Sequence, residues 1–162
     1  MASPWTGAWQ WLSDEYDGRL ILTEGHFCYA FAPKGRRAPK GEQPTDAEAA
    51  ALFRSFHAGA GRVTATRDGD EWLLDMVSSV AHHPADVGNT VRRAVRVEGD
   101  RMFGEHIGTD GTREATHVHQ KLSDLGSGPL AGAWECMADH FDGMLLKTDT
   151  EFRYISVDAQ RP

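Results

Sequence analysis

The chain has 162 residues, 40% of them apolar and 25% charged, and its formal net charge at pH 7 is −7. This length and composition predict one folded domain with a real core and exclude a disordered chain. The negative charge argues against a nucleic-acid or anionic-membrane partner, and no apolar run is long enough to span a bilayer as a helix. The N-terminal MASPWTGAW lacks the pattern of a signal peptide, so we expect a cytoplasmic protein in which Cys28 and Cys136 stay reduced.

The first strand is expected at residues 7–12, where the period-two alternation of a strand places Trp9 and Trp11 on one face. Asp17-Gly18 follows, a dipeptide typical of a tight hairpin turn. The chain is therefore expected to open with a β-hairpin.

Residues 19–31 are strand-like but interrupted by a Glu-Gly pair, which indicates two strand segments that meet at a tight turn or bulge. In the second segment Phe27, Tyr29 and Phe31 lie on one face. We expect this aromatic face to point into the core, because large apolar side chains gain most from burial.

Residues 33–44 are rich in Pro, Gly and basic residues and are expected to form a solvated loop, with a mobile lid over a cavity as the alternative. The only strong helix signal follows, because Thr45 and Glu48 are spaced as a capping box. Gly59 is expected to end this helix. Its apolar stripe consists of Ala49, Leu52, Phe53 and Phe56. Such a helix most simply plugs one end or side of a sheet.

After Gly61 the pattern is again that of strands separated by short turns rich in Gly and Asp. Five more strands are expected, at residues 62–67, 71–80, 90–97, 101–107 and 113–122. With the three opening segments they make eight, which is enough to close a small barrel. The predicted fold is mainly β: an antiparallel up-and-down barrel of 8–10 strands with one short helix over residues 1–125. A linker and a further hairpin occupy residues 126–162.

That further hairpin repeats the start of the chain. Residues 4–30 recur as residues 129–155 without a gap, and 11 of the 27 positions are identical. An isolated hairpin is barely stable in water, so this copy must bury an apolar face. It could widen the barrel to about ten strands, pack outside it as a flap, or dock on a neighbouring copy of the chain. We expect the last of these, a homodimer with the hairpin at its interface.

Several weak motifs occur in the order found in one family: Gly7-Ala8-Trp9, GRLILTEGHF, the helix, a DGD turn, Pro84-x-x-x-Gly88, Val91-Arg92-Arg93 and VEGDRM. Together they resemble the bacterial lipocalin-like domain family of the calycin superfamily over about residues 5–122. The resemblance implies an up-and-down barrel around a small, mostly apolar cavity. It also implies a small-molecule carrier, or a cofactor-free isomerase or cyclase of natural-product pathways. The extra hairpin and the pair His117/His119 depart from the family pattern.

His117 and His119 occupy positions i and i+2 of an expected strand and therefore point to one face. Three interpretations stay open: solvent-facing histidines, which we favour, a polar pair that faces a ligand, or two ligands of a metal ion. A metal site would need a third ligand, for which His82, His83 and His106 are candidates. The spacing alone supplies none, so we predict no metal and no cofactor.

Arg93 shares its strand face with Val91 and Val95, so a valine-lined lumen would contain its guanidinium. An unpaired buried charge costs several kcal/mol, so Arg93 would need a carboxylate partner or an anionic ligand. We favour an internal salt bridge, with Asp75 as the nearest candidate in sequence and Glu105 as the next. Which way Asp75 points is open, because both faces of its strand are apolar.

The favoured function is the binding of an apolar or amphipathic small molecule in the barrel. The expected contacts are Trp9, Phe27, Tyr29, Met76, Arg93, His106, His117 and His119. Trp9 is more simply a packed residue at a barrel end. One alternative is an isomerase, cyclase or lyase whose catalytic set is Arg93, Asp75, His117 and His119, with a histidine moving the proton. Another is a structural or interaction module with a filled lumen.

Overall fold

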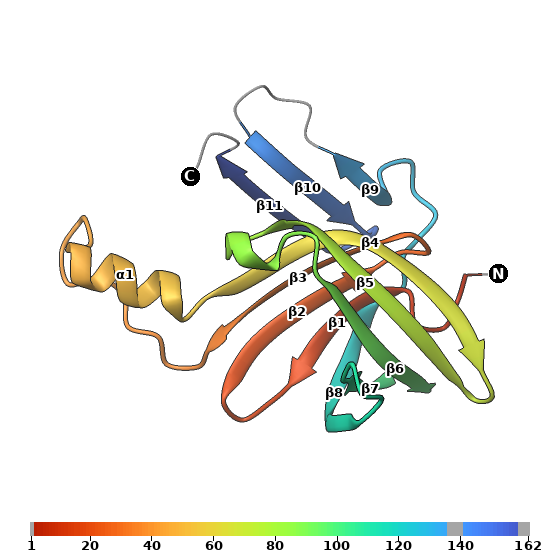
Figure 1. The fold of residues 1–162 in the computed structure, drawn as a ribbon. Coiled ribbons are helices and arrows are strands. Elements are labelled where there is room, and N and C mark those ends of the chain that lie inside the picture. The colour runs from red at the N-terminus through yellow and green to blue at the C-terminus, as the bar shows by residue number, and fades with distance from the viewer. Residues whose placement is uncertain (1, 136–140, 159–162) are drawn as a thin grey trace.

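The structure is a computed structural model that describes residues 2–135 and 141–158. Eight antiparallel strands form a closed barrel in which each strand pairs with the next along the chain, and the first pairs with the eighth (Figure 1). The strands are β1 (Gly7–Leu12), β2 (Tyr16–Leu22), β3 (His26–Pro33), β4 (His57–Asp68), β5 (Glu71–Ala81), β6 (Thr90–Glu98), β7 (Arg101–Ile107) and β8 (Arg113–Ser123). The prediction of an up-and-down barrel is confirmed. The described part of the chain contains no helix long and apolar enough to cross a membrane.

The predicted turn at Asp17-Gly18 is wrong, because both residues lie inside β2. The turn comes earlier, where the Ser13 hydroxyl accepts hydrogen bonds from the backbone amides of Glu15 and Tyr16 at 3.2 and 3.1 Å. Gly18 has a packing role instead. A Cβ placed on it would lie 3.1 Å from the Trp11 ring and 3.2 Å from the Phe31 side chain, so the two aromatic residues close over the bare backbone.

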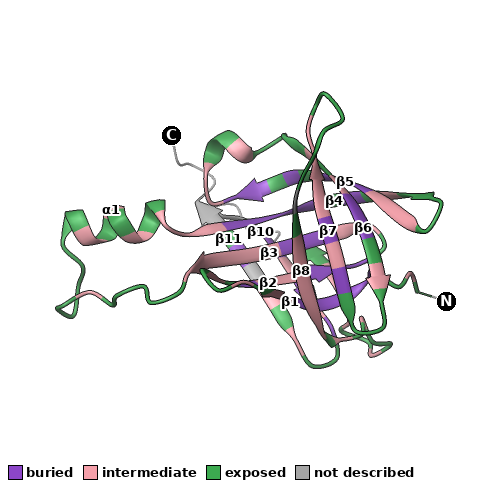
Figure 2. Cartoon of the chain, turned by 90° about the horizontal axis from the view of Figure 1, so that it is seen from below, coloured by how far each residue is buried: buried purple, intermediate pink, exposed green. Residues whose placement is uncertain are grey.

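The helix α1 (Asp46–Arg54) begins as predicted, with Thr45 as its N-cap and both hydrogen bonds of the capping box to Glu48 present. Its predicted end and its predicted role are wrong. It stops before Ser55, and Gly59 lies in β4 against the ring of Tyr29. The helix projects from the barrel, and none of its nine residues is buried (Figures 1 and 2). The helix therefore does not plug the barrel, and the described residues that line the lumen cavity come from the strands.

One end of the barrel is closed by packed side chains. Trp5 and Trp9 are fully buried there, and the indole Nε1 of Trp9 donates a hydrogen bond of 3.0 Å to the Trp5 carbonyl oxygen. The residues that pack around them are Leu22, Phe27, Val63, Leu74, Met76, Val95 and Met102. Trp9 is thus a core residue, as expected. The cavity occupies the lumen beyond these packed side chains.

The repeated segment forms a separate three-stranded sheet made of β9 (Gly132–Glu135), β10 (Phe141–Lys147) and β11 (Phe152–Asp158), in the order β11-β10-β9. This sheet lies against the outside of the barrel of its own chain (Figure 1). It therefore packs as a flap and does not widen the barrel. The homodimer stays a prediction. Cys28 is a free thiol buried under the sheet, and Cys136 lies outside the described residues.

The two copies of the repeat pack back to back. Ile21 and Leu146, which occupy equivalent positions 125 residues apart, are both buried in the core between barrel and sheet. Strand register is also kept, because Trp9 pairs with Leu20 in the barrel as Trp134 pairs with Leu145 in the sheet. The outer faces of the two copies thus share one core, and the inner-wall face of the second copy points away from the barrel.

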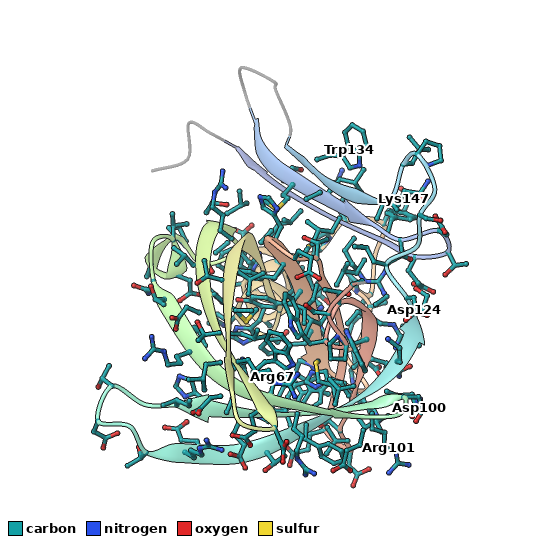
Figure 3. All side chains as sticks on the ribbon, turned by 90° about the vertical axis from the view of Figure 1, so that its right-hand side faces the viewer. Arg67, Asp100, Arg101, Asp124, Trp134 and Lys147 are labelled. Carbon is teal, nitrogen blue, oxygen red and sulfur yellow. The ribbon has the colours of Figure 1, made fainter. Side chains whose placement is uncertain are left out.

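That face is exposed. Trp134 is 48% exposed and Phe152 62%, whereas their counterparts Trp9 and Phe27 are 0% and 1% exposed. Figure 3 shows Trp134 on the side of the sheet turned away from the barrel. The second copy therefore carries the aromatic residues of a barrel wall without a barrel to enclose them.

Candidate functional site: a cavity in the barrel lumen

The lumen contains a cavity of about 250 Å³. Its walls come from seven of the eight barrel strands, all except β4, and most of its lining is apolar. The main apolar residues are Trp11, Phe27, Tyr29, Phe31, Met76 and Met102. The loop between β3 and α1 supplies no lining residue within the described chain, so it is not the lid that was considered as an alternative.

A row of aromatic rings forms one wall. Phe27, Tyr29 and Phe31 alternate along β3 and stack in sequence, with ring centroids 6.1 and 5.8 Å apart. The ring of Trp11 on β1 meets Phe31 edge-on at 5.7 Å. Alternation along the strand predicts this wall, and the contacts expected of Phe27, Tyr29 and Met76 are found. Trp11 and Phe31 were missed as site residues although the same alternation groups them with Trp9 and Phe27.

Three polar side chains form the other wall: Arg93 on β6, and His117 and His119 on β8. Gly104 on β7 pairs with Val95 on one side and His117 on the other and has no side chain. Arg93, which pairs with His106 on β7, extends toward β8, and its Nη1 lies 3.5 Å from Nδ1 of His117. The His117 ring in turn packs on Trp11 at 4.9 Å between centroids.

The salt bridge predicted for Arg93 is absent from the described chain, and the role given to Asp75 is wrong. Asp75 lies on the outer face of β5, where it accepts two hydrogen bonds, of 2.6 and 2.7 Å, from Arg92. The alternative partner Glu105 instead accepts a hydrogen bond of 3.0 Å from Arg113. Both carboxylates keep contact with water on the outside, which costs less than burial in the lumen.

Burial lowers the pKa of Arg93, and the nearby Tyr29 hydroxyl opposes this shift. A guanidinium nevertheless stays protonated in proteins, so the lumen contains a permanent cation. Burial raises the pKa of the Tyr29 phenol, with a further rise from Asp86 and a lowering by Arg93, so the phenol is neutral at pH 7. Nothing among these groups compensates the charge on Arg93.

The interpretation favoured for the two histidines, that they face solvent, is wrong. Burial is the largest cause of the lowered pKa of His117, followed by the charges of Arg93 and His106. The pKa of His119 is lowered to about 4, again by burial first and then by Arg93 and His117. His119 is therefore a neutral imidazole at pH 7, and its Nδ1 is buried without a hydrogen-bond partner in the described chain. Both imidazoles thus line the cavity together with Arg93.

Two further expected contacts do not line the cavity. Trp9 lies in the packed end of the barrel, below the open space. His106 lies where the register between β7 and β8 shifts, and its Nδ1 is 3.0 Å from a carboxylate oxygen of Glu114 at the surface. Among the described residues there is no group of three or more His, Cys, Asp or Glu side chains that could hold a metal ion.

No protein-family model matches the chain, and no curated protein matches it. Among solved structures it is similar to the crystal structure of the uncharacterized protein YLR301w from Saccharomyces cerevisiae. That likeness covers 95% of this chain and 74% of the yeast chain, with a TM-score of 0.60 and 12% sequence identity. At this identity the likeness shows the fold alone, namely a barrel of this architecture.

Proposed function

We propose that this protein binds a small apolar or amphipathic metabolite in the lumen of its barrel. The observation that carries the proposal is the cavity of about 250 Å³ with an aromatic wall on one side and Arg93, His117 and His119 on the other. Ligand sites typically combine such apolar walls with a few converging polar groups. A barrel with a purely structural role would be expected to fill this space with side chains, as it does around Trp9.

A partly buried cation without a carboxylate partner among the described residues supports the same reading. Taking a guanidinium out of water costs several kcal/mol when no partner repays it. A protein under selection for stability alone would replace Arg93 by an apolar residue. Its presence beside an open cavity supports a role in recognising a ligand.

A cofactor-free isomerase, cyclase or lyase is the second candidate function. It is favoured by the convergence of three polar groups, Arg93, His117 and His119, on one cavity. A general base works best when its pKa is near the working pH. The pKa of His119, about 4, makes this imidazole a weak base at pH 7, and the pKa of His117 is lowered too. These shifts favour binding over proton transfer.

The test uses N-phenyl-1-naphthylamine, a neutral apolar dye whose fluorescence rises when it leaves water. We expect saturable binding of one dye per chain, together with quenching of Trp11, which lines the cavity. As a matched pair, Met102→Trp fills the cavity and should abolish binding, whereas Val77→Leu on the outer face of β5 should leave it unchanged. Absence of dye binding to the wild-type chain, with no small molecule co-purifying, would contradict the proposal.

A further inference from the structure

The described residues that line the cavity carry charge of one sign only. Its lining contains no carboxylate, and it contains the guanidinium of Arg93. Arg19 on β2 also borders the cavity, but only with its backbone. Strand alternation turns its side chain outward, toward Arg153 of the C-terminal sheet. Among the described residues that line the cavity, the side chains that face it therefore present one positive charge and two neutral imidazoles. Lys121, further along the inner face of β8, packs on Trp9 and is paired with Asp124.

The position of Arg93 is fixed by its neighbours and not by a counter-ion. It reaches past β7 to His117, and the His117 ring packs in turn on Trp11. The guanidinium has five N–H donors, and the imidazole is its closest polar contact in the described chain, at 3.5 Å. Most of its hydrogen-bonding capacity thus remains for a group that enters the cavity.

We propose that the ligand is an apolar monocarboxylic acid, whose carboxylate is bound by Arg93 and hydrogen-bonded by His117 or His119 while its tail lies along the rings of β3. This inference rests on the proposed function and names the chemistry of the ligand. A carboxylate has the planar, two-oxygen geometry that a guanidinium fork accepts with two parallel hydrogen bonds. Its single negative charge would also neutralise the guanidinium of Arg93.

A phosphate fits less well. A phosphate monoester carries nearly two negative charges at pH 7, so one would remain uncompensated in a mostly apolar lumen. A neutral alcohol or amide would leave the cation of Arg93 unpaired. The cavity of about 250 Å³ has room for the single-ring probes used below.

The experiment compares four probes with one apolar body: 3-phenylpropanoate, 3-phenylpropan-1-ol, 3-phenylpropanamide and 2-phenylethyl phosphate. Each is titrated by calorimetry at pH 7.5 and by displacement of N-phenyl-1-naphthylamine. We expect the acid to bind at least tenfold more tightly than the alcohol and the amide. Arg93→Gln should reduce this preference to near unity, and Arg93→Lys should restore part of it. The matched control Arg92→Gln, on the outer face of the same strand, should keep the preference.

The outcomes separate the two proposals. If the neutral dye binds but the acid gains nothing over the alcohol, or if Arg93→Gln keeps the preference, the carboxylate assignment is wrong and the binding function stands. Tighter binding of the phosphate than of the acid also overturns the assignment. If neither the dye nor any of the four probes binds the wild-type chain, the binding function itself fails. Binding of the dye to Arg93→Gln with wild-type affinity shows that this variant is folded.

Discussion

The guanidinium of Arg93 and the imidazole of His117 lie 3.5 Å apart inside the barrel, on strands that are not paired with each other. Neither residue is near the other in sequence, and β7 separates their strands in the sheet. On β7, Gly104 pairs with His117 and lines the cavity without a side chain at that position. A cation and a neutral base are thereby held side by side in an apolar lumen without a carboxylate, and the functional proposals rest on this arrangement.

Replacing the buried cation should stabilise the protein when no ligand is bound. Arg93→Met keeps the length of the side chain and removes an uncompensated charge, so we expect the free energy of unfolding to rise by about 1–3 kcal/mol. Arg92→Met, which removes an exposed ion pair with Asp75, should change it by less than about 1 kcal/mol. Urea denaturation of the two variants and the wild type checks this. A loss of stability in Arg93→Met would show that the guanidinium already has a partner.

Acid should weaken the fold through His119. The pKa of His119 is about 4 in the folded chain and about 6.5 in the unfolded chain. Between these pH values the imidazole is protonated in the unfolded chain but not in the folded one. The stabilisation is complete above pH 6.5 and is lost as the pH falls toward 4, by about 3 kcal/mol in total. His119→Gln removes this titration, so the difference in unfolding free energy between variant and wild type should change over that pH range. Parallel pH profiles would contradict the burial of this imidazole.

A small residue at position 104 should be needed for the cavity but not for the fold. A Cβ there would meet no atom closer than 4.0 Å, so Gly104→Leu can be accommodated, but its side chain would extend into the cavity that Gly104 lines. We expect at least tenfold weaker dye binding with a melting temperature within a few degrees of the wild type. Unchanged dye binding would place the ligand site elsewhere.

Substitutions at Gly18 and Gly25 test the finding that Gly18 lies inside β2 and not in a turn. A Cβ at Gly18 would lie 3.1–3.2 Å from Trp11 and Phe31, whereas one at Gly25 would meet no atom within 4 Å. Gly18→Ala should therefore cost about 1–2 kcal/mol of unfolding free energy through overpacking, and Gly25→Ala should be close to neutral. Thermal denaturation measures both. Equal effects would contradict the close approach of the two aromatic side chains to β2.

The exposed aromatic face of the C-terminal sheet allows the predicted homodimer to be tested. Light scattering of the wild-type chain should give twice the mass of one chain, and Trp134→Ser combined with Phe152→Ser should give the single mass. Both residues are about half exposed or more and lie on the face turned from the barrel. Val87→Ser, at another exposed apolar position, serves as the control. A wild-type monomer at all concentrations would remove the dimer.

The barrel was predictable from the sequence because its signals are local. Alternation with period two identified the eight barrel strands, although β4 begins at His57, where the helix was expected to continue, and glycine with aspartate marked most of the turns. Asp17-Gly18 misled because glycine serves two purposes: it permits tight turns, and it admits neighbouring rings close to a strand. Which purpose applies depends on Phe31, which lies opposite Gly18 on the next strand.

The site was predictable only in part, for a related reason. The valines around Arg93 indicated correctly that it points inward, and the alternation of aromatic residues on β3 indicated one wall. Its partner could not be found in this way, because the direction of Asp75 depends on which of two apolar faces of β5 the barrel encloses. The back-to-back packing of the two repeats depends on long-range contacts such as Ile21 with the core around Leu146, which no local pattern reveals.

Native mass spectrometry of the protein purified from its own source tests the central claim most directly. The account predicts an ion of one chain carrying one small molecule, whose released mass and fragmentation are those of a carboxylic acid. The same ion should be absent when Arg93→Gln is expressed and purified in the same way. A wild-type chain that carries nothing and also fails to take up added 3-phenylpropanoate would contradict the account.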